Sequence, residues 1–402
     1  MTVFRSLSDR KFLLLWTGQT ISRLGDSIYR IALAWWVLEK TNSATAMGTV
    51  MVFSFIPTIF FSLIGGVTVD RLPRVRLMLL TDLVRGLVVT VIALLASARL
   101  LELWHIYLAS IAFGSVEAFF LPAYTSVIPE LVPRENLTSA NALTSLSNHV
   151  SSVAGPAVGA WLISLSGIPA AFAMDGLSFA VSIAFLLPLS RCIGAPAVAP
   201  SLGLTKDLRD GLRFVAGSPW LWITITMAAL GNITISAPLK VALPFLIKNN
   251  LHADVGALGI VYSSLAVGAV IGTVLFGRRV GSRRQGLIAY SAWFLGGLLI
   301  LAIGLPISLP VVCIAALGVG ALFSIFTIIW TTSLQDSVPG HLLGRVASID
   351  NFGSYALIPV GFSLIGWVTD RTGADMVFMV AGGMTTMLAV LCLTQRAIRN
   401  KD

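Results

Sequence analysis

The chain has 402 residues, of which 56% are hydrophobic and only 11% are charged, and its mean hydropathy is +0.89. A soluble protein of this length needs a more polar surface, because water wets the shell around its apolar core. The net charge of +9 is compatible with nucleic-acid binding, but the basic residues lie between long apolar stretches, as in membrane proteins. Composition thus excludes an ordinary soluble domain and indicates a protein of the lipid bilayer.

About twelve apolar stretches are long enough to cross the hydrocarbon core of a membrane as helices. Because backbone groups in lipid must find partners within their own segment, we predict an all-α polytopic membrane protein. The first stretch is too long and too charged for a cleaved signal peptide, so we expect it to remain as a spanning helix. The predicted spans are 12–38, 45–66, 77–97, 104–124, 139–164, 169–189, 220–247, 255–276, 286–306, 310–332, 343–368 and 375–394.

The lysines and arginines predict the orientation of these spans. If both termini are cytoplasmic, nineteen basic residues lie in inside segments and four lie in outside loops. This is a strong positive-inside bias. We therefore predict a multi-pass protein of the bacterial cytoplasmic (inner) membrane with both termini in the cytoplasm, and we expect no nucleic-acid partner.

The longest polar stretch lies near the middle of the chain and divides it into six spans plus six. Its second part reads LTKDLRDGLRFV, in which apolar residues at helical spacing oppose basic ones. This pattern predicts an amphipathic helix on the cytoplasmic membrane surface. We predict an N-terminal six-helix bundle at 1–190, a cytoplasmic linker at 191–218 and a C-terminal six-helix bundle at 219–402.

The two halves resemble each other weakly. Leu24-Gly25-Asp26 in span 1 parallels Leu230-Gly231-Asn232 in span 7, and TSVIPELVPREN before span 5 parallels TSLQDSVPGHLL before span 11. Two related bundles with a site at their interface are the expected arrangement for a transporter.

Several kinds of chemical site are not indicated by the sequence. It holds no G-x-x-x-x-G-K-S/T motif for ATP. Its three cysteines and four histidines are scattered, so we predict neither a disulfide framework nor a metal site nor a cofactor. No nucleophile and base stand at a workable spacing, so we do not expect an enzyme. Any energy source would be an ion gradient, here that of protons, or a separate subunit.

After span 2 the chain reads Gly66-Val-Thr-Val-Asp70-Arg71-Leu-Pro-Arg74-Val-Arg76. This segment resembles the G-x-x-x-D-R-x-x-R-K/R cytoplasmic loop of the major facilitator superfamily. The glycine allows close helix approach, while the aspartate and arginines form a charge network at a helix end. We predict that the network latches the two bundles in one state and releases them in the other.

Three further charged residues are predicted to belong to this conformational latch. Asp82 and Arg85 lie one helical turn apart near the cytoplasmic end of span 3, where they would support the loop. Asp350, near the start of span 11, is the candidate partner across the bundle interface.

A narrower resemblance points to exporters. In span 5, Gly155-Pro156-Ala-Val-Gly159 resembles the G-P-x-x-G element of exporter branches of the superfamily and predicts a kinked, close-packed helix. The segments GQTISRLGDSIYRIALAWWVLEKTNSA, DRLPRVRLMLLTDLVRG and LPAYTSVIPELVPRENLTSANAL resemble the enterobactin-exporter and macrolide-efflux group. This resemblance implies twelve helices in two pseudo-symmetric bundles, a monomer, and proton-driven export of siderophores or hydrophobic drugs. One departure is that Ser110 precedes Gly114 in span 4, where many drug antiporters carry an arginine.

Charged residues inside spans are expensive, so each one requires a reason. Span 1 holds Gln19, Arg23, Asp26 and Arg30 at spacings that place them on one helical face, which we predict lines the substrate cavity. Asp26 is the first candidate for proton coupling, because a bound anion could compete for its flanking arginines as the cavity alternates. The alternative is a static Arg–Asp–Arg ladder that holds span 1 in place.

Glu117, in the middle of span 4, is the second candidate for proton coupling. We expect it to be protonated at rest, because no basic residue stands at neighbouring helical positions; a hydrogen-bonded structural carboxyl is the alternative. Asn232, Lys240 and Trp330 are the predicted cavity residues of the second half. With the span 1 arginines, Lys240 would favour an anionic or zwitterionic cargo, unless it extends to the outer headgroups instead.

The sequence thus favours a proton-coupled antiporter that exports a small amphipathic molecule by alternating access in the lipid bilayer. A uniporter or importer, or a lysophospholipid flippase, is the alternative within transport. A non-transporting membrane receptor or scaffold is the alternative from another class, although isolated membrane charges give a static scaffold no advantage.

Overall fold

The computed structural model describes residues 4–190, 211–277, 284–305 and 308–399. Within these ranges all regular structure is helical and no strand occurs. The first half contains η1 (Arg5–Ser8), α1 (Arg10–Thr41), α2 (Ala44–Arg71), α3 (Arg74–Ser97), α4 (Leu103–Leu131), η2 (Arg134–Asn136), α5 (Leu137–Ser166) and α6 (Ile168–Ser190). The second contains α8 (Pro219–Gly231), η3 (Asn232–Ser236), η4 (Pro238–Ala242), α9 (Leu243–Phe245), η5 (Leu246–Asn250), α10 (Val255–Gly277), α11 (Gln285–Ile303), α12 (Leu309–Ser337), α13 (Gly340–Tyr355), α14 (Ile358–Thr372), α15 (Ala374–Thr394) and α16 (Arg396–Arg399).

Among the described residues, ten helical segments are long and apolar enough to cross a membrane. This confirms the prediction of a polytopic all-α membrane protein. Two further helices are long but too polar to qualify: α1, with 32 residues, carries three charged groups in its middle, and α5, with 30 residues, is rich in serine, threonine and asparagine. The count of twelve spans therefore stays a prediction.

The chain divides into two compact units, one made of Met1–Thr41 and Thr49–Ala199, the other of Asn42–Gly48 and Pro200–Asp402. The predicted linker at 191–218 lies largely outside the described residues; within it, 211–216 are helical.

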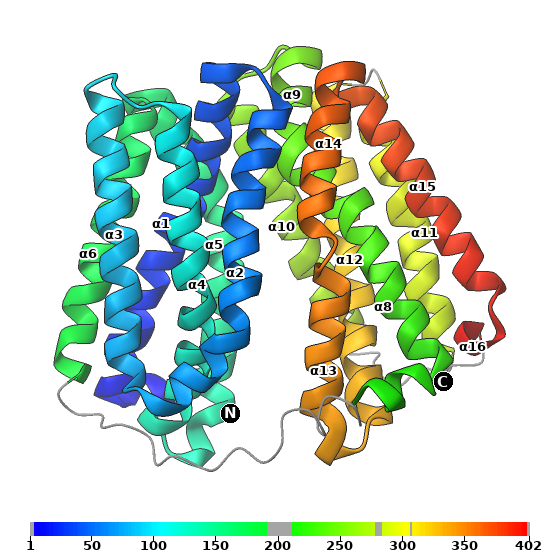
Figure 1. Cartoon of the computed structure of the whole chain (residues 1–402), viewed down its shortest axis with the longest axis horizontal. Helices are drawn as coiled ribbons and strands as arrows, with labels where there is room; N and C mark the ends of the chain where they lie inside the picture. Colours follow the sequence, from blue (N-terminus) through cyan, green and yellow to red (C-terminus); the bar gives the residue numbers. More distant parts are fainter. Residues whose placement is uncertain (1–3, 191–210, 278–283, 306–307, 400–402) are drawn as a thin grey trace. The chain divides into compact units, whose positions relative to one another are not determined.

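In the first unit, α6 packs against both α1 and α3, α5 packs against α1, and α4 packs against α3 (Figure 1). The contact between α1 and α5 depends on small residues. A Cβ atom on Gly155 would collide with Ser27, and one on Gly159 would lie 3.1 Å from the Cα atom of Ile28. Helices in lipid associate through such close backbone contacts, because apolar side chains gain little by leaving the hydrocarbon.

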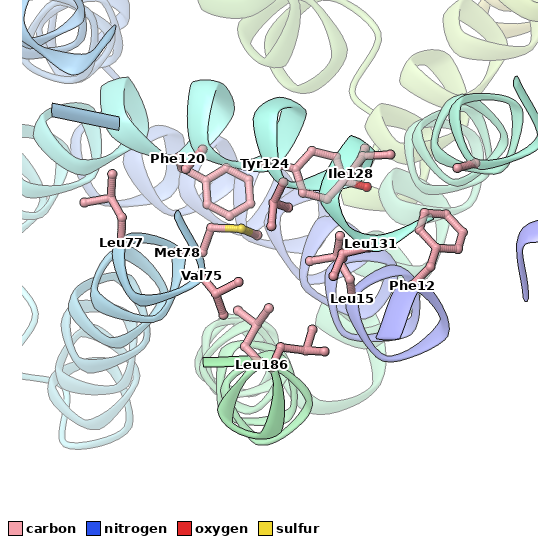
Figure 2. Close-up of a cluster of buried hydrophobic side chains, with 14 of the residues drawn as sticks. Phe12, Leu15, Val75, Leu77, Met78, Phe120, Tyr124, Ile128, Leu131 and Leu186 are labelled. Atoms are coloured by element: carbon pink, nitrogen blue, oxygen red, sulfur yellow. The ribbon is translucent and has the colours of Figure 1, made fainter. Parts of the chain in front are cut away.

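An apolar cluster of the first unit lies between α1, α3, α4 and α6. Figure 2 shows Met78 of α3 beneath Phe120 and Tyr124 of α4, with Leu15 of α1 and Leu186 of α6 completing the group. All five side chains are at most 7% exposed. Two of them, Phe120 and Tyr124, also contact charged residues of the site described in the next section, so the cluster supports that site directly.

In the second unit, α10 and α11 both pack against α12, and α15 packs against α11 (Figure 1). The α10–α12 contact is made by backbone on backbone. Cβ atoms on Gly268 and Gly272 of α10 would collide with the carbonyl groups of Leu317 and Ala321, and a Cβ atom on Gly320 of α12 would collide with that of Leu265. The glycines thus let the two helix axes approach more closely than any side chain would permit.

The segment after α8 has wider, π-helical turns, at η3, η4 and η5. Pro238 and Pro244 lie within it and lack the N–H groups that a regular α-helix needs. A local π-helical turn is one way in which a spanning helix accommodates such a break, and π-bulges often occur at functional sites. Here the first π-helical turn begins at Asn232, one of the predicted cavity residues.

Candidate functional site

The charged face of α1 contacts three neighbouring helices of the first unit. The Arg30 guanidinium donates a hydrogen bond to the Ser27 hydroxyl at 2.6 Å, and that of Arg23 lies 4.7 Å from the centre of the Tyr124 ring. Asp26 lies between them, with 26% of its side chain exposed. Gln19 differs from its prediction as a cavity residue: it is 1% exposed and lines neither of the two cavities described below.

Arg85 of α3 is the centre of the site, because three carboxylates surround its guanidinium. Its nitrogen atoms lie 2.7 Å from Asp82, 3.2 Å from Glu117 and 3.9 Å from Asp26. Only 3% of the Arg85 side chain is exposed. The guanidinium also lies between two aromatic rings, 4.4 Å from the centre of Phe120 and 4.9 Å from that of Phe179. One buried cation is therefore shared by three acids from three helices.

The three acids differ in their access to water. Asp82 has no exposed side-chain surface, whereas 26% of Asp26 and 49% of Glu117 is exposed. Asp82 also accepts hydrogen bonds from the Ser182 hydroxyl at 2.7 Å and from the Gln19 amide at 3.3 Å. Asp82 is thus a buried partner of Arg85 whose contacts are all with protein groups. Asp26 and Glu117 are partly exposed, so each can leave Arg85 and interact with water, a proton or a bound group instead.

Two cavities of the first unit meet at these residues. The first, of about 220 Å³, lies toward α2 and is lined by Met51, Ser54, Thr58, Ser110 and Phe113 among others. The second, of about 210 Å³, lies toward α5 and is lined by Arg23, Asn148, Ser151 and Ser152 among others. Asp26, Arg30, Arg85 and Glu117 line both. The two proton-coupling candidates therefore lie where the two cavities meet.

Several predicted roles change with this geometry. Asp82 and Arg85 were expected to support the cytoplasmic loop; that role stays a prediction, and their observed partners are instead the other charged and polar residues of this site. Glu117 was expected to be protonated at rest, because no basic residue stands at neighbouring positions of its own helix; a basic neighbour comes instead from α3, where Arg85 lies 3.2 Å away. Sequence spacing reports only neighbours on the same helix.

The residues of the predicted loop latch are only partly described. Gly66, Asp70 and Arg71 lie in the last turns of α2, and their side chains are outside the described set. Arg74 donates a hydrogen bond to the Ser126 carbonyl at 2.9 Å and forms an ion pair with Glu130. Arg76 is exposed. The latch therefore remains a prediction.

The second unit carries a separate polar chain that links η3, α12 and α13. The Trp330 indole N–H donates to one Asp350 oxygen at 3.0 Å, and the Ser354 hydroxyl donates to the other at 3.0 Å. The Asn232 amide donates to the Ser354 carbonyl at 2.8 Å and accepts from the Ser236 hydroxyl at 3.0 Å. Asp350 was predicted as a latch partner; its observed partners are instead a predicted cavity residue and a serine.

Lys240, the other predicted cavity residue of the second unit, is exposed, and its amino group lies 5.7 Å from the centre of the Phe362 ring. No group of three or more histidine, cysteine or acidic residues among the described residues is placed to hold a metal ion.

Sequence reasoning missed Ser182, which donates a hydrogen bond to Asp82, and it named Tyr124 only as one of several aromatic residues, without its contact to Arg23. A signal for the first was present, since Asp175, Ser178 and Ser182 at spacings of three and four mark one polar face of α6. All three are at most 5% exposed. Tyr124 gave no such signal, because aromatic residues are common on every face of a spanning helix.

Comparisons with known proteins agree with this architecture. The family model of the transmembrane secretion effectors matches residues 1–402. Macrolide efflux protein A of Streptococcus pyogenes is 25% identical over 397 residues, covering 98% of this chain and 97% of that protein. The enterobactin exporter EntS of Shigella boydii is 31% identical over 313 residues, covering 76% of this chain and 72% of that protein.

Solved structures show the same fold. A bacterial homologue of the iron transporter ferroportin, in an inward-facing state, has a TM-score of 0.74 at 17% identity and covers 96% of this chain and 99% of its own. A POT family transporter in complex with 5-aminolevulinic acid has a TM-score of 0.74 at 12% identity and covers 96% of both chains. With the full-length family match, these findings show that the chain belongs to the transmembrane secretion effector family of the major facilitator superfamily and is a multi-pass membrane transporter, not an enzyme.

Proposed function

We propose that this transporter exports a small amphipathic molecule across the bacterial inner membrane in exchange for protons. The names of the macrolide and enterobactin exporters that it resembles support the direction of transport and the class of cargo. Twelve spans in two six-helix bundles, both termini in the cytoplasm, and action as a monomer are parts of the same proposal. The mechanism would be rocking of 1–190 against 219–402, so that a midplane site opens to each side in turn.

The observation that carries the proton coupling is the sharing of Arg85 by three acids. Asp82 is fully buried and cannot leave the cation cheaply, whereas Asp26 and Glu117 reach the two cavities. A proton that binds Asp26 removes one negative charge from this cluster and weakens its contact with Arg85. The site can therefore exist with or without that contact, and a transport cycle needs two such arrangements.

Cargo would compete at the same place. Arg23 and Arg30 line the second cavity together with Asp26, so an anionic group bound there could pair with two cations beside that acid. Cargo binding would thus change the charge environment of the acid that is proposed to carry the proton. This exchange links cargo binding to proton binding, and it suits an anionic or zwitterionic cargo. The only energy source required is the proton gradient, with no bound cofactor.

The test uses everted membrane vesicles that are acidified by respiration and contain a pH-quenched dye. Siderophores, macrolides, cationic dyes and lysolipids are added in turn to vesicles with the wild type, Asp26→Asn or Asp336→Asn at matched expression. Asp336 is an exposed acid at the end of α12 and serves as the control. We expect cargo-triggered dequenching in the wild type and the control, and its loss in Asp26→Asn.

Equal dequenching in all three variants would keep the exporter but move the coupling group, with Glu117 tested next. Cargo movement without any proton movement would contradict antiport and favour a uniporter or a lysophospholipid flippase, according to which compound moves. Silence across the whole panel, with correctly inserted protein, would count against transport of these classes and favour a receptor or scaffold.

A further inference from the structure

The G-x-x-x-D-R spacing of the cytoplasmic loop occurs a second time in the chain. It reads Gly66-Val-Thr-Val-Asp70-Arg71 at the end of α2 and Gly366-Trp-Val-Thr-Asp370-Arg371 at the end of α14. The functional site does not involve the second copy. Its side chains lie among the described residues.

The Asp370 carboxylate of the second copy caps the N-terminus of α2. The first four N–H groups of an α-helix have no partners inside the helix. For α2 these are the groups of residues 44–47. The first two donate to the two carboxylate oxygens of Asp370, at 2.6 and 2.9 Å. The other two donate to the hydroxyl and carbonyl oxygens of Ser43, at 3.2 and 3.3 Å, and the Ser43 hydroxyl donates to Asp370 at 2.7 Å.

The glycine of the motif explains how Asp370 reaches that helix end. A Cβ atom on Gly366 would lie 2.6 Å from the Ala44 carbonyl oxygen, and one on Gly48 would collide with the Phe362 carbonyl. The backbones of α14 and of the first turns of α2 are therefore in direct contact. The aspartate stands one turn beyond the glycine, at the height where the N–H groups of α2 emerge.

The charge of Asp370 is available for this contact. Among the described residues, no basic side chain lies within ion-pairing distance of it. The neighbouring Arg371 lies instead 4.5 Å from the centre of the Trp367 ring on its own helix. A carboxylate at a helix N-terminus is favoured by both the hydrogen bonds and the helix dipole.

All these contacts lie within the second compact unit, which includes Asn42–Gly48, whereas α2 belongs to the first unit from Thr49 onward. One continuous helix is thus shared by both units, and Asp370 holds its first turn. Asp370 is itself exposed, so water can replace its hydrogen bonds when they break. A contact of charge and hydrogen bonds at an exposed helix end can be released, unlike a buried apolar one.

We propose that Asp370 is a positioning residue of the transport cycle: it seats the start of α2 while access from the outside is closed and releases it when that access opens. The inference rests on the alternating access and the orientation of the proposed function. The second G-x-x-x-D-R copy would thus act as a latch on the outer side. Gly366 allows the close approach of α14 to α2, and Asp370 supplies the hydrogen-bond acceptors.

The test measures access to the first cavity from outside the cell. Met51, which lines that cavity, is changed to cysteine in a chain whose three native cysteines are serine, and intact cells are treated with a membrane-impermeant maleimide. We expect Asp370→Ala to raise the labelling rate about tenfold, the equilibrium change that corresponds to loss of a good helix cap. Asp375→Ala, an acid at the start of α15, is the control and should label like the parent chain.

Asp370→Asn separates positioning from a merely structural role. Its amide oxygen can still cap the helix, although it lacks the charge, so labelling should lie between the parent and Asp370→Ala. Unchanged labelling in well-expressed Asp370→Ala and Asp370→Asn would overturn the proposal, as would an equal rise in Asp375→Ala. The labelling requires neither cargo nor a proton gradient. If Asp370→Ala raises the labelling rate but the parent chain shows no antiport in vesicles, the proton coupling is refuted and the latch stands. If the parent chain shows antiport but Asp370→Ala labels at the parent rate, only the latch is refuted.

Discussion

Removal of the Arg85 charge should destabilise the first unit severely. In Arg85→Gln, the fully buried carboxylate of Asp82 loses a cation at 2.7 Å, and no other described cation replaces it. Removing one partner of a buried ion pair costs about 3–5 kcal/mol, because the remaining charge stays desolvated. Asp26 and Glu117 add less, since 26% and 49% of their side chains are exposed and water screens them.

The assay is thermal unfolding of the purified transporter in detergent, followed by intrinsic fluorescence. A loss of about 3–5 kcal/mol should lower Tm by roughly 6–20 °C for a unit of this size. Arg76→Gln is the matched control, because Arg76 lies on the same helix but is exposed, and its change should stay within about 0.5 kcal/mol.

A second substitution identifies the acid that matters. Arg85→Gln combined with Asp82→Asn should recover at least about 2 kcal/mol, since it removes the buried charge that the first change left unpaired. Arg85→Gln combined with Glu117→Gln should recover much less, because Glu117 is half exposed. The reasoning is refuted if Arg85→Gln unfolds at the wild-type temperature, or if Glu117→Gln rescues it as well as Asp82→Asn does.

Two further changes test packing and the second unit. Gly155→Ala should lower the free energy of unfolding by about 1–3 kcal/mol, because its methyl group would collide with Ser27. Gly383→Ala is the control and should be neutral or mildly stabilising, since nothing lies within 4 Å of its added atom. Equal effects of the two changes on thermal unfolding would contradict the packing. Trp330→Phe keeps an aromatic ring but removes the N–H that Asp350 accepts, so it should cost about 1–2 kcal/mol. The same loss in an Asp350→Ala background, which has no acceptor, would show that the two residues are not coupled.

Much of the fold could be predicted from hydropathy alone. The spans predicted at 77–97 and 286–306 correspond to α3 and α11 within three residues at each end. The long apolar run that each contains can satisfy its backbone only as a helix. The break between α13 and α14 was not predicted and falls inside the span at 343–368, where the turn at 356–357 precedes a proline.

The site could be predicted only in part, because spacing reveals the neighbours on one helix and not those on another. The polar face of α1 was visible, and so was the one-turn separation of Asp82 and Arg85. The meeting of Arg85 with Asp26 and Glu117 depends on how α1, α3 and α4 rotate as they pack, and no residue pattern in a single chain states that rotation. For the same reason Gln19, although on the expected face, is buried against Ser182 instead of lining a cavity.

The glycine contact between α10 and α12 has a mechanical consequence. Gly268, Gly272 and Gly320 bring carbonyl groups of one helix against the backbone of the other, so no side-chain rotamer lies between them to absorb strain. Neither helix can roll or slide without first lifting away from its neighbour, and tightly packed interiors transmit strain instead of dissipating it. We therefore expect α10 and α12 to move together as one rigid pair during a conformational change. Bending would then occur in the loops and in the π-helical turns after Asn232.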